Sequence, residues 1–347
     1  MNRIIIDKVV YLCLLSGDTD SCQDRHFMIS QRLTITLALL LVLVAGCGKK
    51  KVVSKKSARK LPEWFAGYWN TSMTEVSTYE LKQARFGNVY EGEAFLSFSP
   101  VVYSRARHIE AAIIDTLNKD QMKTLQLVNH RNYKCGNQWH SLSQMVVMPQ
   151  IIREGPYALK IAASVNELNG ISYAQLNLDA NKYLLQIRSP DNREGDQNRV
   201  VPLTMTEDQI WCMMRIYPDS LPTGSAMILP GLLSTRLRHE MVQPQSAQMS
   251  LQIAVNAELP PALQNRGMLK KYVIDYPENG RTLVIYFNAV PPHFIEGWEE
   301  SYVDSGTSSK RSRTIAIRTN TKKGTGSELI RPAASSLLSV SVKDTLH

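Results

Sequence analysis

The sequence lacks an apolar run long enough to cross a lipid bilayer as a helix. Its longest run, Leu33 to Val44, is interrupted by two threonines and falls short of the ~20 apolar residues that a membrane-spanning helix needs. A basic residue precedes this run, and Ala45 and Gly46 separate it from Cys47. This arrangement is typical of a lipoprotein signal peptide over residues 28–46, with Cys47 as the lipidated first residue after cleavage.

Cleavage before Cys47 would leave the chain anchored by acyl chains, palmitate among them, whose burial contributes ~0.8 kcal/mol per CH₂. Met28 stands where such a peptide begins, so we interpret residues 1–27 as an upstream extension from a misassigned start. Because Gly48 rather than aspartate follows the cysteine, we expect the outer membrane, at its periplasmic face or at the cell surface. A transmembrane anchor that ends at an ordinary cysteine is the alternative, and the short apolar run argues against it.

Positive charge is concentrated in two short segments. The formal net charge is +9, but residues 48–60 hold seven basic and no acidic side chains, and residues 310–323 hold six basic and no acidic ones. Residues 61–309 are therefore mildly acidic. A basic tether over 47–60 favours contact with anionic lipid head groups, at ~1 kcal/mol per Lys or Arg near such a surface. We expect a membrane partner and no nucleic acid partner.

The common catalytic and metal-binding motifs are also missing. The sequence has no Gly-x-Ser-x-Gly elbow, no His-Glu-x-x-His pair and no phosphate-binding glycine loop, so we predict no catalytic residue, no metal and no cofactor. Strand alternation would place His130 and His140 on one face and Cys135 on the other, which disfavours a zinc site. Cys135 and Cys212 form either a disulfide in an oxidising compartment or two free thiols.

Short segments of alternating apolar and polar residues dominate the chain after the tether. They predict strands over 76–86, 92–102, 123–133, 141–149, 158–165, 171–178, 182–189, 225–229, 232–238, 248–256, 271–288 as a hairpin, 294–303 and 313–318. We therefore predict a mainly β fold: a large curved antiparallel sheet, half-barrel or barrel-like, with one or two short helices. This single domain covers residues 61–320, and 321–347 form an irregular tail.

Local signals predict two helices and one tight hairpin. Thr206 and Gln209 suit a capping box at the start of a helix over Glu207 to Tyr217. Apolar residues four positions apart suggest a second helix over His108 to Gln121. Asn279-Gly280 predicts a type I′ turn within Lys271 to Asn288.

Five stretches resemble an uncharacterised family of lipid-anchored envelope proteins of Bacteroidetes-type bacteria. They are YELKQARFG at 79–87, GISYAQLNL at 170–178, REGDQ at 193–197, MRIYPDSLPTG at 214–224 and GWEESY at 297–302. Members are often catalogued as septum-formation inhibitor Maf, a name that implies a nucleotide pyrophosphatase. The resemblance itself implies lipid anchoring and no established activity.

The Maf name can be tested against its motif. Maf enzymes open with Ser-x-Ser-Pro-Arg-Arg at a strand end, where the arginines meet the phosphates of the substrate. Residues 97–100 (SFSP) begin this pattern, but Val101 and Val102 occupy the arginine positions. No βαβ unit is expected around them, so we expect no Maf-type catalysis.

Four residues are candidates for lining a ligand cleft. Tyr79 and Arg85 lie at even spacing on the first predicted strand, and Trp298 and Glu299 belong to a stretch with one large aromatic and two carboxylates. Aromatic side chains beside an arginine suit a ligand cleft. The alternative is an ordinary sheet in which Arg85 and Glu299 are solvated or paired across strands.

Two functions are compatible with these features. The leading hypothesis is a non-enzymatic, lipid-anchored protein whose curved sheet binds an apolar ligand or an envelope partner. The alternative is a periplasmic hydrolase with a polar cleft. An apolar cavity would favour the first, and a cleft that gathers titratable groups would favour the second. A curved sheet with an apolar inner face also resembles the architecture of periplasmic lipid and lipoprotein carriers, a likeness of fold alone.

Overall fold

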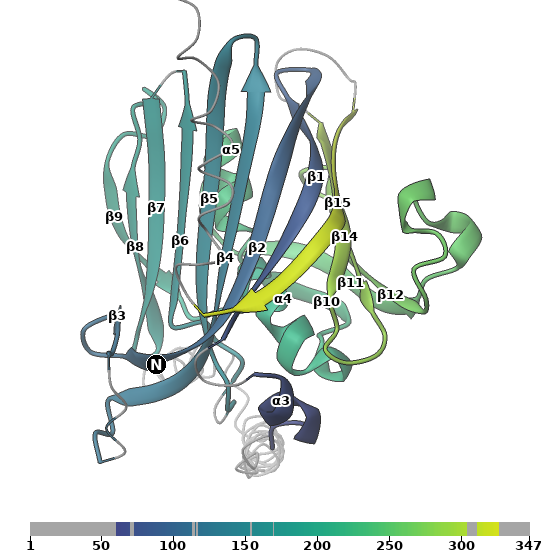
Figure 1. Ribbon diagram of the computed structural model, residues 1–347. Helices are drawn as coiled ribbons and strands as arrows, with labels where there is room; N and C mark the ends of the chain where they lie inside the picture. Colours follow the sequence, from purple (N-terminus) through teal and green to yellow (C-terminus); the bar gives the residue numbers. More distant parts are fainter. Residues whose placement is uncertain are drawn as a thin grey trace, which may run out of the picture. The chain divides into compact units, whose positions relative to one another are not determined.

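A single antiparallel sheet organises the chain. The computed structural model describes residues 60–69, 73–112, 115, 117–152, 155–168, 170–303 and 311–325. In chain order the strands are β1 (Thr74–Arg85), β2 (Asn88–Ser104), β3 (Ile109–Glu110), β4 (Gln121–Cys135), β5 (Gln138–Pro149), β6 (Lys160–Glu167), β7 (Gly170–Asp179), β8 (Lys182–Arg188), β9 (Gln197–Pro202), β10 (Gly224–Ile228), β11 (Gln245–Ile253), β12 (Leu269–Tyr276), β13 (Arg281–Asn288), β14 (Ile295–Val303) and β15 (Arg311–Gly324). Figure 1 shows their arrangement.

The predicted fold class is confirmed. The strands follow the order β10-β11-β12-β13-β14-β15-β1-β2-β4-β5-β6-β7-β8-β9, with β3 paired to β2. Neighbours in the chain pair as hairpins over most of this order, and the pairing of β15 with β1 joins the two halves. The meander predicted over 158–189 is present as β6, β7 and β8. The order begins at β10 and ends at β9, so the sheet is open.

Short helices cover the inner face of the curved sheet. The α-helices are α3 (Glu63–Tyr68), α4 (Glu207–Ile216) and α5 (Leu232–Arg238), and the 3₁₀ turns are η1 (Pro218–Ser220), η2 (Asn256–Glu258) and η3 (Pro261–Leu263). The predicted capping box starts α4: the Gln209 N–H donates to the Thr206 hydroxyl at 3.2 Å, and the Thr206 N–H donates to the Gln209 side chain at 3.2 Å. Helix α4 packs against β4 and β5, and α5 packs against β5, β6 and β7. No helix among the described residues has the length and apolarity to cross a membrane.

Residues 232–238 form α5, so the strand predicted there is wrong. Gly231 precedes this helix and has no side chain to cap it. Both carboxylate oxygens of Asp208, on α4, instead accept the Leu232 N–H at 3.1 Å. The free N–H groups at a helix N-terminus need acceptors, and here the acceptor comes from 24 positions earlier. The acceptor that starts this helix therefore lies outside its local sequence.

The helix predicted over His108 to Gln121 is also wrong in the described part of that segment. Ile109–Glu110 form the short strand β3, and turns follow. The carboxylate of Asp120 accepts hydrogen bonds from the Ser104 hydroxyl at 2.5 Å and from the Ala106 N–H at 2.7 Å. Side-chain acceptors of this kind compete with helical hydrogen bonds for the backbone, and the spacing of apolar residues does not reveal them.

The hairpin predicted over Lys271 to Asn288 is present, but its turn differs from the prediction. The loop between β12 and β13 comprises residues 277–280. Gly280 has φ 62°, whereas Asn279 is not at positive φ, so the type I′ assignment is wrong. A two-residue turn would place Pro277 inside a strand, where it has no N–H for the ladder. Pairing therefore stops earlier, and the loop takes four residues.

The last strand is longer than predicted. We predicted a strand over 313–318 and an irregular tail over 321–347, but β15 ends at Gly324, which pairs with Thr74 at the start of β1. This pairing joins segments from the two ends of the domain, so tertiary contact extends the strand. The predicted upstream extension, the signal peptide, the lipidated Cys47 and the tail beyond residue 325 lie outside the described residues.

Candidate functional site

Tyr79 and Trp298, two of the predicted ligand-lining residues, lie side by side in the core. Their ring centroids are 4.9 Å apart, and the Tyr79 hydroxyl donates to the Ile295 carbonyl at 2.8 Å. Trp211 of α4 packs edge-on against Trp298 with a centroid distance of 5.4 Å. Both predicted residues are buried. The sequence therefore identified two residues that touch on the inner face, and α4 covers them.

Arg85 and Glu299 lie in other parts of the sheet. Arg85, at the end of β1, forms an ion pair with Glu167 of β6. Glu299 lies on the outer face of β14, where the Arg313 guanidinium is 2.5 Å from its carboxylate. The four predicted residues therefore do not share one surface. Arg85 and Glu299 each form an ion pair with a residue of another strand, which is the alternative considered for them in the sequence.

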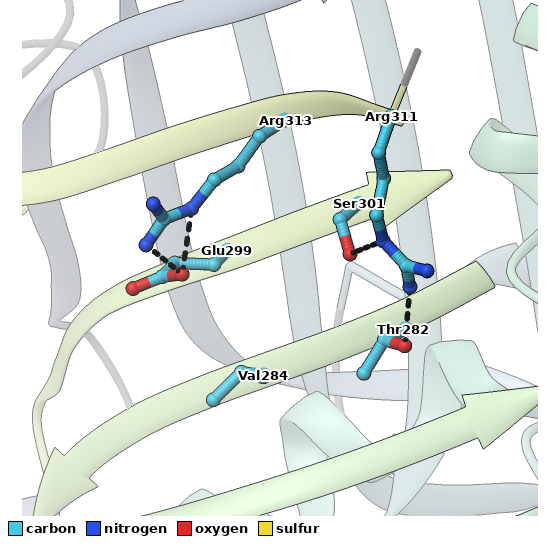
Figure 2. Close-up of a pocket in the computed structure, with 6 residues that line it drawn as sticks. All are labelled: Thr282, Val284, Glu299, Ser301, Arg311 and Arg313. Carbon is cyan, nitrogen blue, oxygen red and sulfur yellow. Dashed lines mark hydrogen bonds and ion pairs between the residues drawn. The ribbon is translucent and has the colours of Figure 1, made fainter. Parts of the chain in front are cut away.

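The outer face around Glu299 carries a groove of about 310 Å³. Figure 2 shows the residues that line it, from β13, β14 and β15: Thr282, Val284, Glu299, Ser301, Arg311 and Arg313. The Arg311 guanidinium donates to the Ser301 hydroxyl at 3.0 Å and to the Thr282 hydroxyl at 2.9 Å. The polar residues that line the groove therefore bind one another, and Val284 is its one apolar lining residue.

A cluster of buried charges surrounds Arg281 on the inner face. Its guanidinium donates to Glu207 of α4 at 2.5 and 2.7 Å and to Glu300 of β14 at 2.7 Å. The Tyr276 hydroxyl donates to Glu207 at 2.7 Å, and Arg131 lies 4.0 Å from Glu300. Burial raises the pKa of Glu300, but the surrounding arginines, Arg281 first, outweigh burial and lower it to about 2. These carboxylates bind arginines, and the cluster holds α4 to the sheet.

Asp208, also on α4, is a buried carboxyl group with a pKa near neutrality. Burial, and next the charge of Glu207, raise the pKa of Asp208 to about 7. A carboxyl group in this range suits general acid or base chemistry. Asp208 is fully buried, however, and it accepts hydrogen bonds from the Leu232 N–H and from the Gln144 amide. These contacts join α4, α5 and β5, which is a structural role.

A second buried cluster, which we call the rim clasp, joins the ends of four strands. It consists of Arg85 (β1), Tyr133 (β4), His140 (β5) and Glu167 (β6). Arg85 donates to the two oxygens of Glu167 at 2.8 and 2.5 Å, and the Tyr133 hydroxyl donates to Glu167 at 2.5 Å. Burial raises the pKa of Glu167, but the hydrogen bonds and charge of Arg85 outweigh burial, so the pKa lies below its ordinary value.

Exposed apolar side chains lie at the same strand ends as the rim clasp. Five of them, which we call the apolar rim, lie at the hairpin tips β1–β2, β4–β5 and β6–β7: Phe86, Val89, Trp139, Leu168 and Ile171, with 49, 58, 61, 72 and 59 % of their surfaces exposed. Phe86 and Gly87 both have positive φ, 54° and 72°. They form the two-residue turn between β1 and β2, so this turn holds a large aromatic side chain in solvent.

The apolar rim is absent from the sequence prediction. Phe86 and Leu168 lie in turns, which belong to neither face of a sheet. Period-two alternation places Val89, Trp139 and Ile171 on the outer face of their strands, but it does not show that the three hairpin tips are neighbours. A signal was nevertheless present: Phe86 beside Gly87, and Trp139 close after Gly136-Asn137, are large apolar residues where polar turn residues are usual.

The histidines and cysteines considered for a metal site are separated. His140 is buried opposite Tyr133 on the inner face, whereas His130 lies one position before the buried Arg131 and thus on the outer face. The prediction that both histidines share a face is wrong, because the turn between β4 and β5 changes the phase of the alternation. Cys135 and Cys212 are free thiols. No cluster of three potential metal ligands occurs in the part of the chain that the structure describes.

Comparison with known proteins adds no relative. No family model matches this chain, and no curated protein or solved structure is significantly similar to it.

Proposed function

We propose that this chain is a lipid-anchored protein of the cell envelope, most consistent with the outer membrane, that acts by binding rather than by catalysis. The apolar rim is its binding surface and binds an apolar ligand or an envelope partner. The anchor rests on the sequence around Cys47 and on the resemblance to lipid-anchored envelope proteins. The observation that carries the binding role is the gathering of five exposed apolar residues on three neighbouring hairpin tips.

The inner face of the sheet is a less suitable place for a ligand. Helices α4 and α5 fill it with buried side chains, including Trp211, Met214 and Leu233. The buried carboxylates beside them bind arginines, as Glu207 and Glu300 do with Arg281. Binding at the rim needs no movement of these helices. A hydrolase, the alternative function, would have to use other groups, such as those of the outer groove.

Cross-linking from the rim tests this proposal. The full chain is produced in cells with a photoreactive phenylalanine analogue at Trp139, and in a matched variant at Val200, which is equally exposed, at 61 %, on β9. We expect adducts from position 139 and few from position 200, identified by mass spectrometry as lipid, small molecule or protein. Equal labelling at the two positions, or none at 139, would contradict a binding role for the rim.

A further inference from the structure

The rim clasp ties together the hairpin tips that carry the apolar rim. Phe86 follows Arg85 directly in the chain, and Leu168 follows Glu167. The guanidinium of Arg85 is 2.5 Å from the carboxylate of Glu167. This ion pair ties the tip that carries Phe86 to the tip that carries Leu168, although the two hairpins lie at either side of β4–β5. The Arg85 guanidinium also lies 4.2 Å from the centre of the Phe86 ring.

The charge of the rim is small and positive. Among the described residues of the three tips, 85–89, 134–139 and 167–171, Lys134 is the one charged residue with an exposed side chain. Arg85 and Glu167 are charged as well, but they neutralise each other within the rim clasp. The described residues of these three tips therefore offer apolar side chains, a tryptophan and a single cation, and Glu91, two residues after Val89, is the next exposed carboxylate along β2.

We propose that the apolar rim docks on the interfacial region of a lipid bilayer, with Trp139 and Phe86 at the level of the head groups. This proposal rests on the proposed function and specifies its partner. Tryptophan is enriched at membrane interfaces, where its apolar ring and its N–H are both accommodated. Lys134 pairs with Trp139 across the hairpin, and its ammonium group can reach the lipid phosphates while its methylene groups stay beside apolar atoms.

The size of the rim favours a bilayer over a protein partner. Its five side chains expose on the order of 500 Å², whereas a stable protein interface buries about 800 Å² on each partner. A membrane contact does not need that area, because the lipid anchor already holds the chain at the bilayer and raises the effective concentration of the rim there. Three short hairpin tips also present their apolar side chains individually, which suits a deformable lipid surface.

The β1–β2 hairpin tip, which carries Phe86, lies at the end of β1 opposite α3 (Figure 1). β1 has 12 residues, which at ~3.4 Å per residue separate the two ends by about 40 Å. Residues 48–60 can span up to about 45 Å when fully extended. A chain anchored at Cys47 thus has enough length for the rim to reach the membrane that holds the anchor.

Tryptophan fluorescence with brominated lipids tests the proposal on the full chain. The protein is reconstituted into vesicles of phosphatidylcholine and phosphatidylglycerol that carry brominated acyl chains. The same vesicles are then added in excess, so that the rim can contact either the vesicle that holds the anchor or a second vesicle. The difference between wild type and Trp139→Phe isolates the emission of Trp139, the most exposed of the five tryptophans. We expect a blue shift and at least twofold quenching by the brominated lipid.

Variants of the other rim residues make the test specific. Leu168→Ser with Ile171→Ser should reduce the quenching of Trp139 at least twofold. The matched control is Leu184→Ser with Val200→Ser, two exposed apolar residues paired on β8 and β9, and it should leave the quenching unchanged. Circular dichroism verifies that both variants are folded.

Three results would overturn the proposal. Trp139 emission that stays solvent-like and unquenched would exclude lipid contact. A blue shift of Trp139 emission that grows with protein concentration, without quenching by brominated lipid, would identify a second copy of the chain as the partner instead. Equal losses in the control variant would remove the specificity of the rim. Two other measurements test the proposed function independently of this proposal. An absence of acyl label on Cys47 would contradict the anchor, and cross-links from position 139 no more abundant than from position 200 would contradict binding at the rim.

Discussion

Arg85 of β1 and Glu167 of β6 form a bidentate ion pair although β2, β4 and β5 lie between their strands. In a flat sheet these two strands would be about 19 Å apart, at ~4.8 Å per strand. The contact therefore requires strong curvature at this end of the sheet, and it places the three hairpin tips of the apolar rim around one buried cluster.

Arg85→Leu should lower the free energy of unfolding by about 3 kcal/mol, because it leaves the Glu167 carboxylate buried without its cation. Arg85→Leu combined with Glu167→Leu should recover most of that loss, since no unpaired charge remains. Urea denaturation of the wild type and both variants at pH 7 measures this. A double variant as unstable as the single one would mean that the ion pair is not the source of the effect.

Acid should destabilise the fold through Glu300. Its pKa in the folded chain is about 2, below the ordinary value of 4.5. A carboxyl group with a lowered pKa contributes stability above its ordinary pKa, and this contribution is lost as the pH falls from about 4.5 to about 2. The loss should be on the order of 3 kcal/mol. Glu300→Gln should be less stable at pH 7 and should show a smaller decline over that window, which denaturation at a series of pH values will reveal.

Asp208 should have the opposite pH dependence. Its pKa in the folded chain is about 7, above the ordinary value of 3.8, so its contribution to stability falls as the pH rises from about 4 to about 7. Asp208→Asn removes the titration and keeps one oxygen to accept the Leu232 N–H. We expect the variant to lose the decline and to equal or exceed the wild type at pH 8. Unfolding midpoints at pH 5 and pH 8 provide the comparison, and parallel curves would contradict the raised pKa.

Gly280→Val should destabilise the hairpin between β12 and β13. Gly280 has φ 62°, a conformation that costs ~1 to 3 kcal/mol for a branched side chain. A Cβ atom there would meet Val303 at an ordinary distance of 3.7 Å, so backbone strain is the cause. Gly280→Asn is the matched control, because asparagine tolerates positive φ better than other residues. Valine and asparagine variants with equal denaturation midpoints would exclude strain at this position.

Cys47→Ser should abolish membrane retention while leaving the folded domain intact. The serine cannot carry the thioether-linked acyl chains that a lipoprotein anchor needs. Metabolic labelling with a palmitate analogue measures the change directly. Incorporation into the serine variant equal to that of the wild type would exclude the predicted anchor.

Local chemistry was sufficient for much of the fold. The capping box of Thr206 and Gln209 starts α4 as predicted, because both partners lie within one helical turn. The meander of β6, β7 and β8 followed from alternation and turn residues. Of the candidate site residues, Tyr79 and Trp298 do meet, because each lies on the inner face of its strand.

The remaining features depend on contacts between residues far apart in the chain. The start of α5 depends on Asp208, 24 positions away, and the rim clasp joins Arg85 to Glu167, 82 positions away. The curvature of the sheet decides which strand ends lie close together. The alternation of apolar and polar residues predicts the face of each residue but does not predict this curvature. By itself the sequence therefore determined most of the strands and the helix α4, and the lipid anchor stays a prediction. Only the tertiary structure decided that the three hairpin tips with exposed apolar residues adjoin one buried cluster, because their position depends on how the whole sheet bends.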